Sequence, residues 1–142
     1  MVVISINFLA VDPGTQKCGL AVVTDQAMVL KKMVIPLADL IGTIFALHQE
    51  FQLALVIVGD RTHSKVIREM LTPLNLQILA VDEDKSSIEG RYRYLKENTR
   101  GLARIIPIGL RIPQQPYDDY VAVVLAERYL ANNSNMLGAH TI

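Results

Sequence analysis

The stretch "FLAVDPGTQKCGLAVV", residues 8–23, joins two apolar runs through a short polar turn and leaves a lone carboxylate, Asp12, where the first run ends. Residues 2–11 predict a long buried strand, and residues 18–24 predict a second one. Because the link is short, we expect the two strands to be antiparallel neighbours. A charge beside a core is costly unless it is paired or binds a cation. Asp12 is therefore either a turn opener before Pro13 or one corner of a metal site.

Outward from this stretch, the pattern predicts one α/β domain over residues 1–133. Residues 28–35 predict a third strand, which completes an antiparallel meander. Two further strands are expected at residues 53–58 and 76–81. Helices are expected at residues 37–51, 62–71 and 117–132, and another is expected to begin at residue 86. Antiparallel strands followed by β-α-β crossovers imply a mixed sheet with helices on its faces. Residues 134–142 show little patterning and are expected to form a flexible tail.

Composition limits the class of protein further. A hydrophobic fraction of 51% in 142 residues is typical of a folded domain and not of a disordered chain. No apolar stretch reaches the roughly 18 residues of a membrane span, and the N-terminal residues lack a secretory pattern. We therefore expect a cytoplasmic protein with no membrane partner. Cys18 is the single cysteine, which excludes an intrachain disulfide and a cysteine-based zinc site.

The charges are balanced overall but not evenly spread. Fourteen basic residues match fourteen acidic ones, which counts against strong sequence-blind binding to nucleic acid. Residues 84–111 nevertheless hold seven of the fourteen basic residues. This segment is either a local positive face or an ordinary solvated helix and loop.

Three acidic positions fall at one predicted end of the sheet. Asp12 and the pair Asp82-Glu83 follow predicted strands, and the pair Asp118-Asp119 lies near the start of the last helix. Converging carboxylates repel unless they are protonated or bridged by a cation, and oxygen ligands suit Mg²⁺ or Mn²⁺. Two such ions can activate water and stabilise the leaving oxygen of a phosphodiester. Neighbouring residues diverge in strands and helices, so one ligand is expected from each pair.

Each acidic position also has a purely structural interpretation. Asp12 can open a turn. Asp82 and Glu83 can form a solvated link, and the Asp118-Asp119 pair can favour a helix N-terminus through the helix dipole. The residues alone leave these alternatives open.

The chain resembles the YqgF family, also called RuvX, in the RNase H-like superfamily that includes the Holliday junction resolvase RuvC. The matching stretches are "LAVDPGTQKCGLAV" (9–22), "LVIVGD" (55–60), "VDEDKSSIEGR" (81–91) and "DDYVAVVLAERYL" (118–130). They occur in the family's order and span most of the chain. The resemblance implies an RNase H-like fold, with a five-stranded mixed sheet whose first three strands are antiparallel and whose last two are parallel.

The same resemblance implies a divalent-metal-dependent nuclease. Asp12, Glu83 and Asp118 match the family's acidic residues, and would be catalytic residues and ligands of Mg²⁺ or Mn²⁺, with two ions when substrate is bound. The choice of Glu83 over Asp82 comes from this match alone. The family is linked mostly to maturation of the precursor of small-subunit (16S) ribosomal RNA, so nucleic acid is the expected partner.

Five further residues are candidates for substrate binding. Thr15 and Lys17 follow the first turn and can meet phosphate, and His63 lies at a predicted helix start near the same end. Arg91 and Arg93 can contact a nucleic-acid backbone, because arginine offers paired donors. The alternative for both arginines is an exposed helix face.

Other functions remain open at this stage. A DNA junction resolvase would use the same carboxylates and would need a symmetric dimer for paired cuts, whereas the sequence is compatible with a monomer or a homodimer. A non-catalytic module associated with nucleic acid or the ribosome would keep the fold. The Asp-x-Gly-Thr turn is also similar to the phosphate loop of actin-like and sugar-kinase ATPases, but those proteins need a second lobe.

Overall fold

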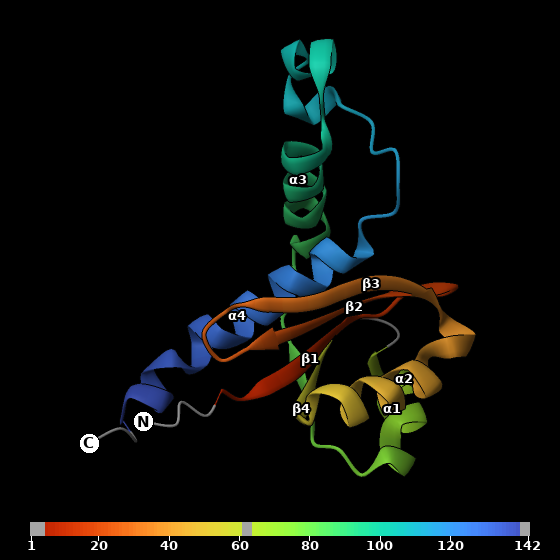
Figure 1. Cartoon of the computed structure of the whole chain (residues 1–142), viewed down its shortest axis with the longest axis vertical. Helices are drawn as coiled ribbons and strands as arrows, with labels where there is room; N and C mark the ends of the chain where they lie inside the picture. The colour runs from red at the N-terminus through yellow and green to blue at the C-terminus, as the bar shows by residue number, and fades with distance from the viewer. Residues whose placement is uncertain (1–4, 61–63, 140–142) are drawn as a thin grey trace.

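A computed structural model describes residues 5–60 and 64–139, with side chains described through residue 133. It contains one five-stranded sheet in the order β3-β2-β1-β4-β5 (Figure 1). The strands are β1 (Asn7–Asp12), β2 (Lys17–Thr24), β3 (Val29–Pro36), β4 (Leu53–Gly59) and β5 (Ile78–Val81). The first three strands are antiparallel to one another, and β4 and β5 run parallel to β1. The predicted mixed sheet is confirmed, and the arrangement is the RNase H-like fold.

Two layers of helices bury the two faces of the sheet. On one face lie α1 (Leu40–Phe51) and α2 (Ser64–Leu71), and on the other lies α4 (Asp118–Ala139) (Figure 1). Side chains along β1 alternate between the layers, as the pleat requires. Leu9 and Val11 pack with α1 and α2, whereas Phe8 and Ala10 pack with α4. In the described part of the chain, no helix is both long and apolar enough to cross a membrane.

Several element ends differ from the sequence-based prediction. β1 begins at Asn7, and the side chain of Ile6 before it is already exposed. The predicted strand began at residue 2, and its residues 2–4 lie outside the described part of the chain. The helix predicted from residue 37 starts with a 3-10 turn, η1 (Leu37–Asp39), and a second 3-10 turn, η2 (Thr72–Leu74), follows α2. The last helix continues to Ala139, past the predicted end at residue 132. The spacing of apolar residues identifies the buried part of a helix or strand. It does not locate an end that lies in solvent.

The helix α3 (Ser86–Asn98) projects away from the sheet (Figure 1). Its middle crosses α4, where Tyr94 packs edge-on against Tyr120 with ring centroids 5.5 Å apart. Beyond α3 come two 3-10 turns, η3 (Gly101–Ile105) and η4 (Ile108–Leu110), before the chain returns to α4. We call residues 98–114 the arm.

Candidate active site

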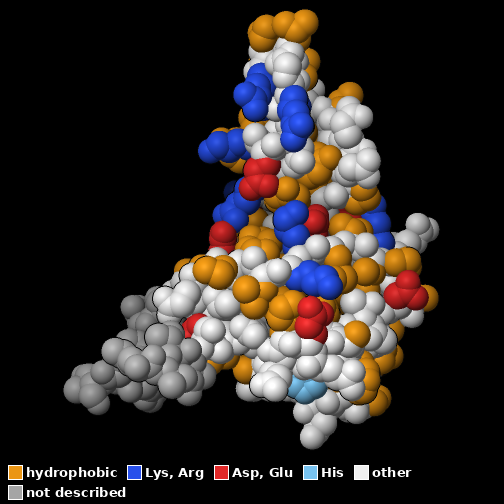
Figure 2. Space-filling view, in the orientation of Figure 1, with side chains coloured by type: hydrophobic (Ala, Val, Ile, Leu, Met, Phe, Trp, Pro, Cys, Tyr) orange, Lys and Arg blue, Asp and Glu red, His pale blue; other side chains and the backbone are white. Residues whose placement is uncertain are grey.

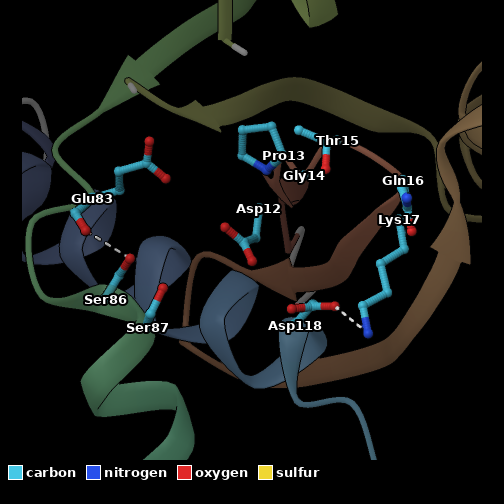
Figure 3. Close-up of a pocket in the computed structure, with 10 residues that line it drawn as sticks. All are labelled: Asp12, Pro13, Gly14, Thr15, Gln16, Lys17, Glu83, Ser86, Ser87 and Asp118. Carbon is cyan, nitrogen blue, oxygen red and sulfur yellow. Dashed lines mark hydrogen bonds and ion pairs between the residues drawn. The ribbon is translucent and has the colours of Figure 1, made fainter. Parts of the chain in front are cut away.

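A cavity of about 410 Å³ opens at the edge of the sheet where the parallel strands β1, β4 and β5 end (Figure 3). We call it the acidic cleft. It is lined by residues from three distant stretches of the chain: Asp12, Pro13, Gly14, Thr15, Gln16, Lys17, Glu83, Ser86, Ser87 and Asp118. All three carboxylates singled out in the sequence are among them, together with Thr15 and Lys17.

Asp12 enters the acidic cleft from the end of β1. It follows Phe8 and Ala10 on the side of the sheet that α4 covers, because side chains two residues apart share a face. Burial first, and then the charges of Asp118 and Glu83, raise the pKa of Asp12 from 3.8 to about 7. The like charges of the cleft are therefore close enough to disfavour one another's ionisation.

Glu83 is held in the short connection between β5 and α3 and is only 9% exposed. Its carbonyl oxygen accepts hydrogen bonds from the backbone N–H of Ser86 (3.0 Å) and from the Ser86 hydroxyl (2.7 Å). Its backbone N–H donates to Asp60 Oδ1 at 3.3 Å. A Cβ at Gly59 would overlap the Glu83 carboxylate, so the glycine at the end of β4 leaves the space that this side chain occupies.

Asp118 is the first residue of α4 and reaches the cleft because α4 begins directly against β2. A Cβ at Gly19 would overlap the Asp118 carbonyl, so only glycine permits this approach. Asp118 Oδ2 is buried and has no hydrogen-bond partner among the described residues, and the Lys17 ammonium lies 3.8 Å from it. Burial raises the pKa of Asp118, and the charge of Lys17 opposes that shift.

The second member of each acidic pair points elsewhere. Asp82 is exposed and accepts a hydrogen bond from the Asp84 backbone N–H at 3.0 Å. Asp119 Oδ2 lies 3.3 Å from the Lys32 ammonium, which also lies 4.1 Å from the centre of the Tyr120 ring. Each pair therefore contributes one carboxylate to the cleft, as their spacing predicted.

The other candidate residues divide into three groups. Thr15 and Lys17 line the cleft. Arg91 donates to the Arg111 carbonyl, and Arg93 forms a 2.5 Å ion pair with Glu127, so both arginines have intramolecular partners. His63 lies outside the described residues.

Two serines that are not among the site residues predicted from the sequence also line the cleft. Ser86 and Ser87 begin α3, directly after the acidic pair at 82–83. Serine is common at helix starts, so these residues give no functional signal in the sequence. They line the cleft because α3 begins at the edge of the sheet where the parallel strands end. The nearby Asp60, which holds the Glu83 backbone, directly follows the apolar strand β4, so the signal that marks Asp12 at the end of β1 could have found it as well.

The donors of the acidic cleft fit a hard divalent cation. They are carboxylate and hydroxyl oxygens, the carboxylates repel one another, and one buried oxygen lacks a hydrogen-bond partner. Within the described residues, no three His, Cys, Asp or Glu side chains already surround a single ion position. Mg²⁺ usually takes one or two carboxylates and keeps several waters, so a complete protein cage is not required.

No protein-family model matches the sequence, and no curated protein matches it either. Among solved structures, RuvC from Thermus thermophilus matches with a TM-score of 0.51 and 18% identity, over 92% of this chain and 96% of that chain. This likeness supports the RNase H-like fold described above.

Two weaker likenesses involve larger proteins. A ROK family glucokinase from Streptomyces griseus, in complex with glucose and AMPPNP, has a TM-score of 0.41 and 15% identity over 61% of this chain and 36% of that chain. A ROK family transcriptional regulator, a homolog of the E. coli MLC protein, has a TM-score of 0.43 and 13% identity over 62% and 30%. The chain thus spans about a third of either protein, and neither likeness bears on its function.

Proposed function

We propose that this protein is a divalent-metal-dependent nuclease that hydrolyses phosphodiester bonds in structured nucleic acid. The observation that carries the proposal is the meeting of Asp12, Glu83 and Asp118 in one cleft, where burial and then the charges of the other two carboxylates raise the pKa of Asp12 to about 7. Carboxylates arranged in this way are stable together when a cation neutralises them. The RNase H-like fold supports the same reading, because RuvC shares it.

Asp12, Glu83 and Asp118 are the residues that would hold Mg²⁺ or Mn²⁺, and the bound ions would supply an activated water and charge neutralisation at the phosphate. The Lys17 side chain lines the cleft and is half exposed, so its ammonium is placed to pair with a phosphate oxygen of the substrate. The hydroxyls of Thr15 and Ser87 line the same cavity and can donate to other phosphate oxygens. Ser86 has a different role, since its hydroxyl holds the backbone of Glu83.

Two substrates are proposed, in order. The resemblance of the sequence to the YqgF family favours a precursor of small-subunit ribosomal RNA. The likeness to RuvC over 92% of the chain favours a four-way DNA junction as the second candidate. Both are folded nucleic acids, so the choice does not alter the proposed chemistry.

The test is cleavage of a folded RNA precursor fragment and of a four-way DNA junction, each with Mg²⁺, with Mn²⁺ and with EDTA. We expect cleavage of one of them with either ion, none with EDTA and none by Asp12→Asn. Asp39→Asn is the matched control, because Asp39 is exposed and lies outside the cleft. Binding of either nucleic acid without metal-dependent cleavage would reject the nuclease and leave the non-catalytic module.

A further inference from the structure

The arm carries a surface unlike that of the rest of the molecule. Residues 98–114 contain three arginines and no carboxylate, although the whole chain has no net charge. Four large apolar side chains on the arm are largely in solvent: Leu102 (84% exposed), Ile105 (78%), Leu110 (73%) and Ile112 (78%). Figure 2 shows apolar side chains at the extreme tip of the molecule, with Lys and Arg side chains directly below them. Such a cluster of exposed apolar side chains marks an interaction surface.

The arm is also hollowed between the end of α3 and the 3-10 turns. This hollow has a volume of about 550 Å³, and its lining includes the apolar Leu95, Ile106 and Leu110 together with Arg100 and Arg111. Apolar walls beside guanidinium groups suit a ligand that joins a flat apolar body to an anionic group.

The arginines of the arm are held in place by the backbone. Arg104 Nε donates to the Thr99 carbonyl at 3.0 Å, and Arg111 Nε donates to the Ile106 carbonyl at 2.8 Å. A guanidinium has five N–H donors, so each of these side chains is oriented while it keeps donors for an anion. Arg100 is exposed at the start of the arm.

These features distinguish between possible occupants. A second copy that docked arm to arm would bring two arginine-bearing patches together, because a two-fold contact pairs identical surfaces. Like charges in such a contact repel, and the arm has no carboxylate to compensate them. Nucleic acid provides phosphates for the arginines and bases for the apolar side chains. Leu and Ile side chains can wedge between bases, and at unpaired bases they avoid the cost of unstacking a paired step.

We infer that the arm binds nucleic acid at a second point, with Arg100 and Arg104 on phosphates and Leu102 and Ile105 against unpaired bases. The inference rests on the proposed function for the identity of the polyanion. The arm lies at the far end of α3, whose 13 residues span about 20 Å at 1.5 Å per residue. At about 3.4 Å per base-pair step this distance is about six steps. The substrate class is therefore a nucleic acid with unpaired bases about six base pairs from the bond at the acidic cleft.

The test measures binding in EDTA, where cleavage is absent, by fluorescence anisotropy at several salt concentrations. The probes are a perfect RNA duplex and the same duplex with a bulge of unpaired bases. We expect Arg100→Gln/Arg104→Gln to weaken binding of both probes about tenfold and to reduce the salt slope by about 2, from about 0.9 per lost phosphate contact. Leu102→Gln/Ile105→Gln should weaken binding of the bulged probe about tenfold, leave the perfect duplex within about twofold and keep the salt slope.

The matched control removes two exposed cations from the body of the molecule, in Lys31→Gln/Arg68→Gln on β3 and α2. It should bind both probes within about twofold of the unchanged chain. Equal binding by the arm variants, equal loss in the control, or no binding by the unchanged chain would overturn the inference. A change of oligomeric state in Leu102→Gln/Ile105→Gln, with unchanged binding, would also overturn it and would assign the arm to self-association.

A second readout separates this inference from the proposed function. The small diester bis(4-nitrophenyl) phosphate is too short to span α3 from the acidic cleft to the arm, so with Mn²⁺ the arm variants should hydrolyse it within about twofold of the unchanged chain. If no chain hydrolyses it or cuts nucleic acid, the nuclease is rejected while the binding data still decide the role of the arm. If the arm variants alone lose hydrolysis of the small diester, the arm acts on the cleft itself and the inference is wrong.

Discussion

The acidic cleft and the arm lie at opposite ends of α3 and are built in opposite ways. The cleft crowds Asp12, Glu83 and Asp118 together, and two glycines let backbone and side chains approach closely there. The arm has arginines and exposed apolar side chains but no carboxylate. Each arrangement is unfavourable in the isolated chain, and each is relieved by a different ligand: a cation in the cleft and a polyanion on the arm. A single helix, α3, thus separates the proposed metal site from the proposed nucleic-acid-binding surface.

The largest effect is expected within the acidic pair at residues 82–83. Glu83→Gln should lower metal-dependent cleavage about 10³-fold, or roughly 4 kcal/mol, because it removes a carboxylate from the cleft. Asp82→Asn, one residue earlier, should stay within about threefold, because Asp82 points away from the cleft. Single-turnover cleavage at saturating protein compares the two. Equal losses in both variants would contradict the assignment of Glu83 as the ligand.

The next effect concerns the close packing that distinguishes the cleft from the arm. Gly19→Ala should lower the free energy of unfolding by about 3 kcal/mol, because its Cβ would overlap the Asp118 carbonyl at the start of α4. Gly109→Ala, on the arm, meets nothing within 4 Å and should change stability by less than about 0.5 kcal/mol. Urea unfolding measures both variants. An unchanged free energy of unfolding in Gly19→Ala would mean that the start of α4 can move away from β2.

The third effect is a pH dependence that belongs to the cleft. Because the pKa of Asp12 is raised from 3.8 to about 7, the folded chain retains a proton that the unfolded chain has released. Without divalent ions, the free energy of unfolding should therefore fall as pH rises between about 4 and 7. From pH 5 to pH 7 the loss is roughly 2.3 kcal/mol, because the slope of about 1.36 kcal/mol per pH unit falls to about half as the pH reaches the pKa of Asp12 in the folded chain.

Asp12→Asn cannot ionise and should lose most of that dependence. Urea unfolding in EDTA at pH 5, 6 and 7 compares the two chains, and Asp39→Asn is the control that should keep the full slope. An Asp12→Asn chain with an undiminished slope would show that Asp12 is ionised in the cleft without a metal.

The smallest effect tests whether the nucleic-acid-binding surface is confined to the arm or extends along α3 to Arg93. The ion pair between Arg93 and Glu127 joins α3 to α4, and its side chains are 38% and 39% exposed. Such a pair is worth about 0.5 kcal/mol, and a double-mutant cycle with Arg93→Gln and Glu127→Gln measures that coupling. Arg93→Gln should leave nucleic-acid binding within about twofold. A loss of about 1 in the salt slope would instead restore the sequence-based prediction that Arg93 contacts the substrate.

The sequence predicted the sheet better than it predicted the projections from it. Apolar runs located all five strands, because each of them packs against the core on at least part of its length. The direction of α3 and the 3-10 turns after it depend on the contact of Tyr94 with Tyr120 and on proline geometry, neither of which has a periodic signal. The arm was anticipated only as a cluster of basic residues.

The acidic cleft was predictable in its carboxylates and not in its surroundings. Asp12 and the pairs Asp82-Glu83 and Asp118-Asp119 stand out because each lies beside an apolar run, and a charge there needs an explanation. The resemblance to the YqgF family then selects Glu83 and Asp118 within the pairs. Ser87 carries no such signal, because serine at a helix start is ordinary. The position of Asp119 beside Lys32 of β3 carries no signal in the sequence, because only the packing of α4 across the sheet brings the two side chains together.

Whether the carboxylates of the cleft share a divalent ion is tested most directly by crystallography with Mn²⁺, whose anomalous scattering locates the ion. The expected result is a peak in the acidic cleft about 2.1 Å from an oxygen of Asp12, with an oxygen of Glu83 or Asp118 as a second ligand. Crystals of Asp12→Asn should lack that peak. An empty cleft at saturating Mn²⁺, or an ion bound only elsewhere on the molecule, would contradict the metal centre and the nuclease built on it.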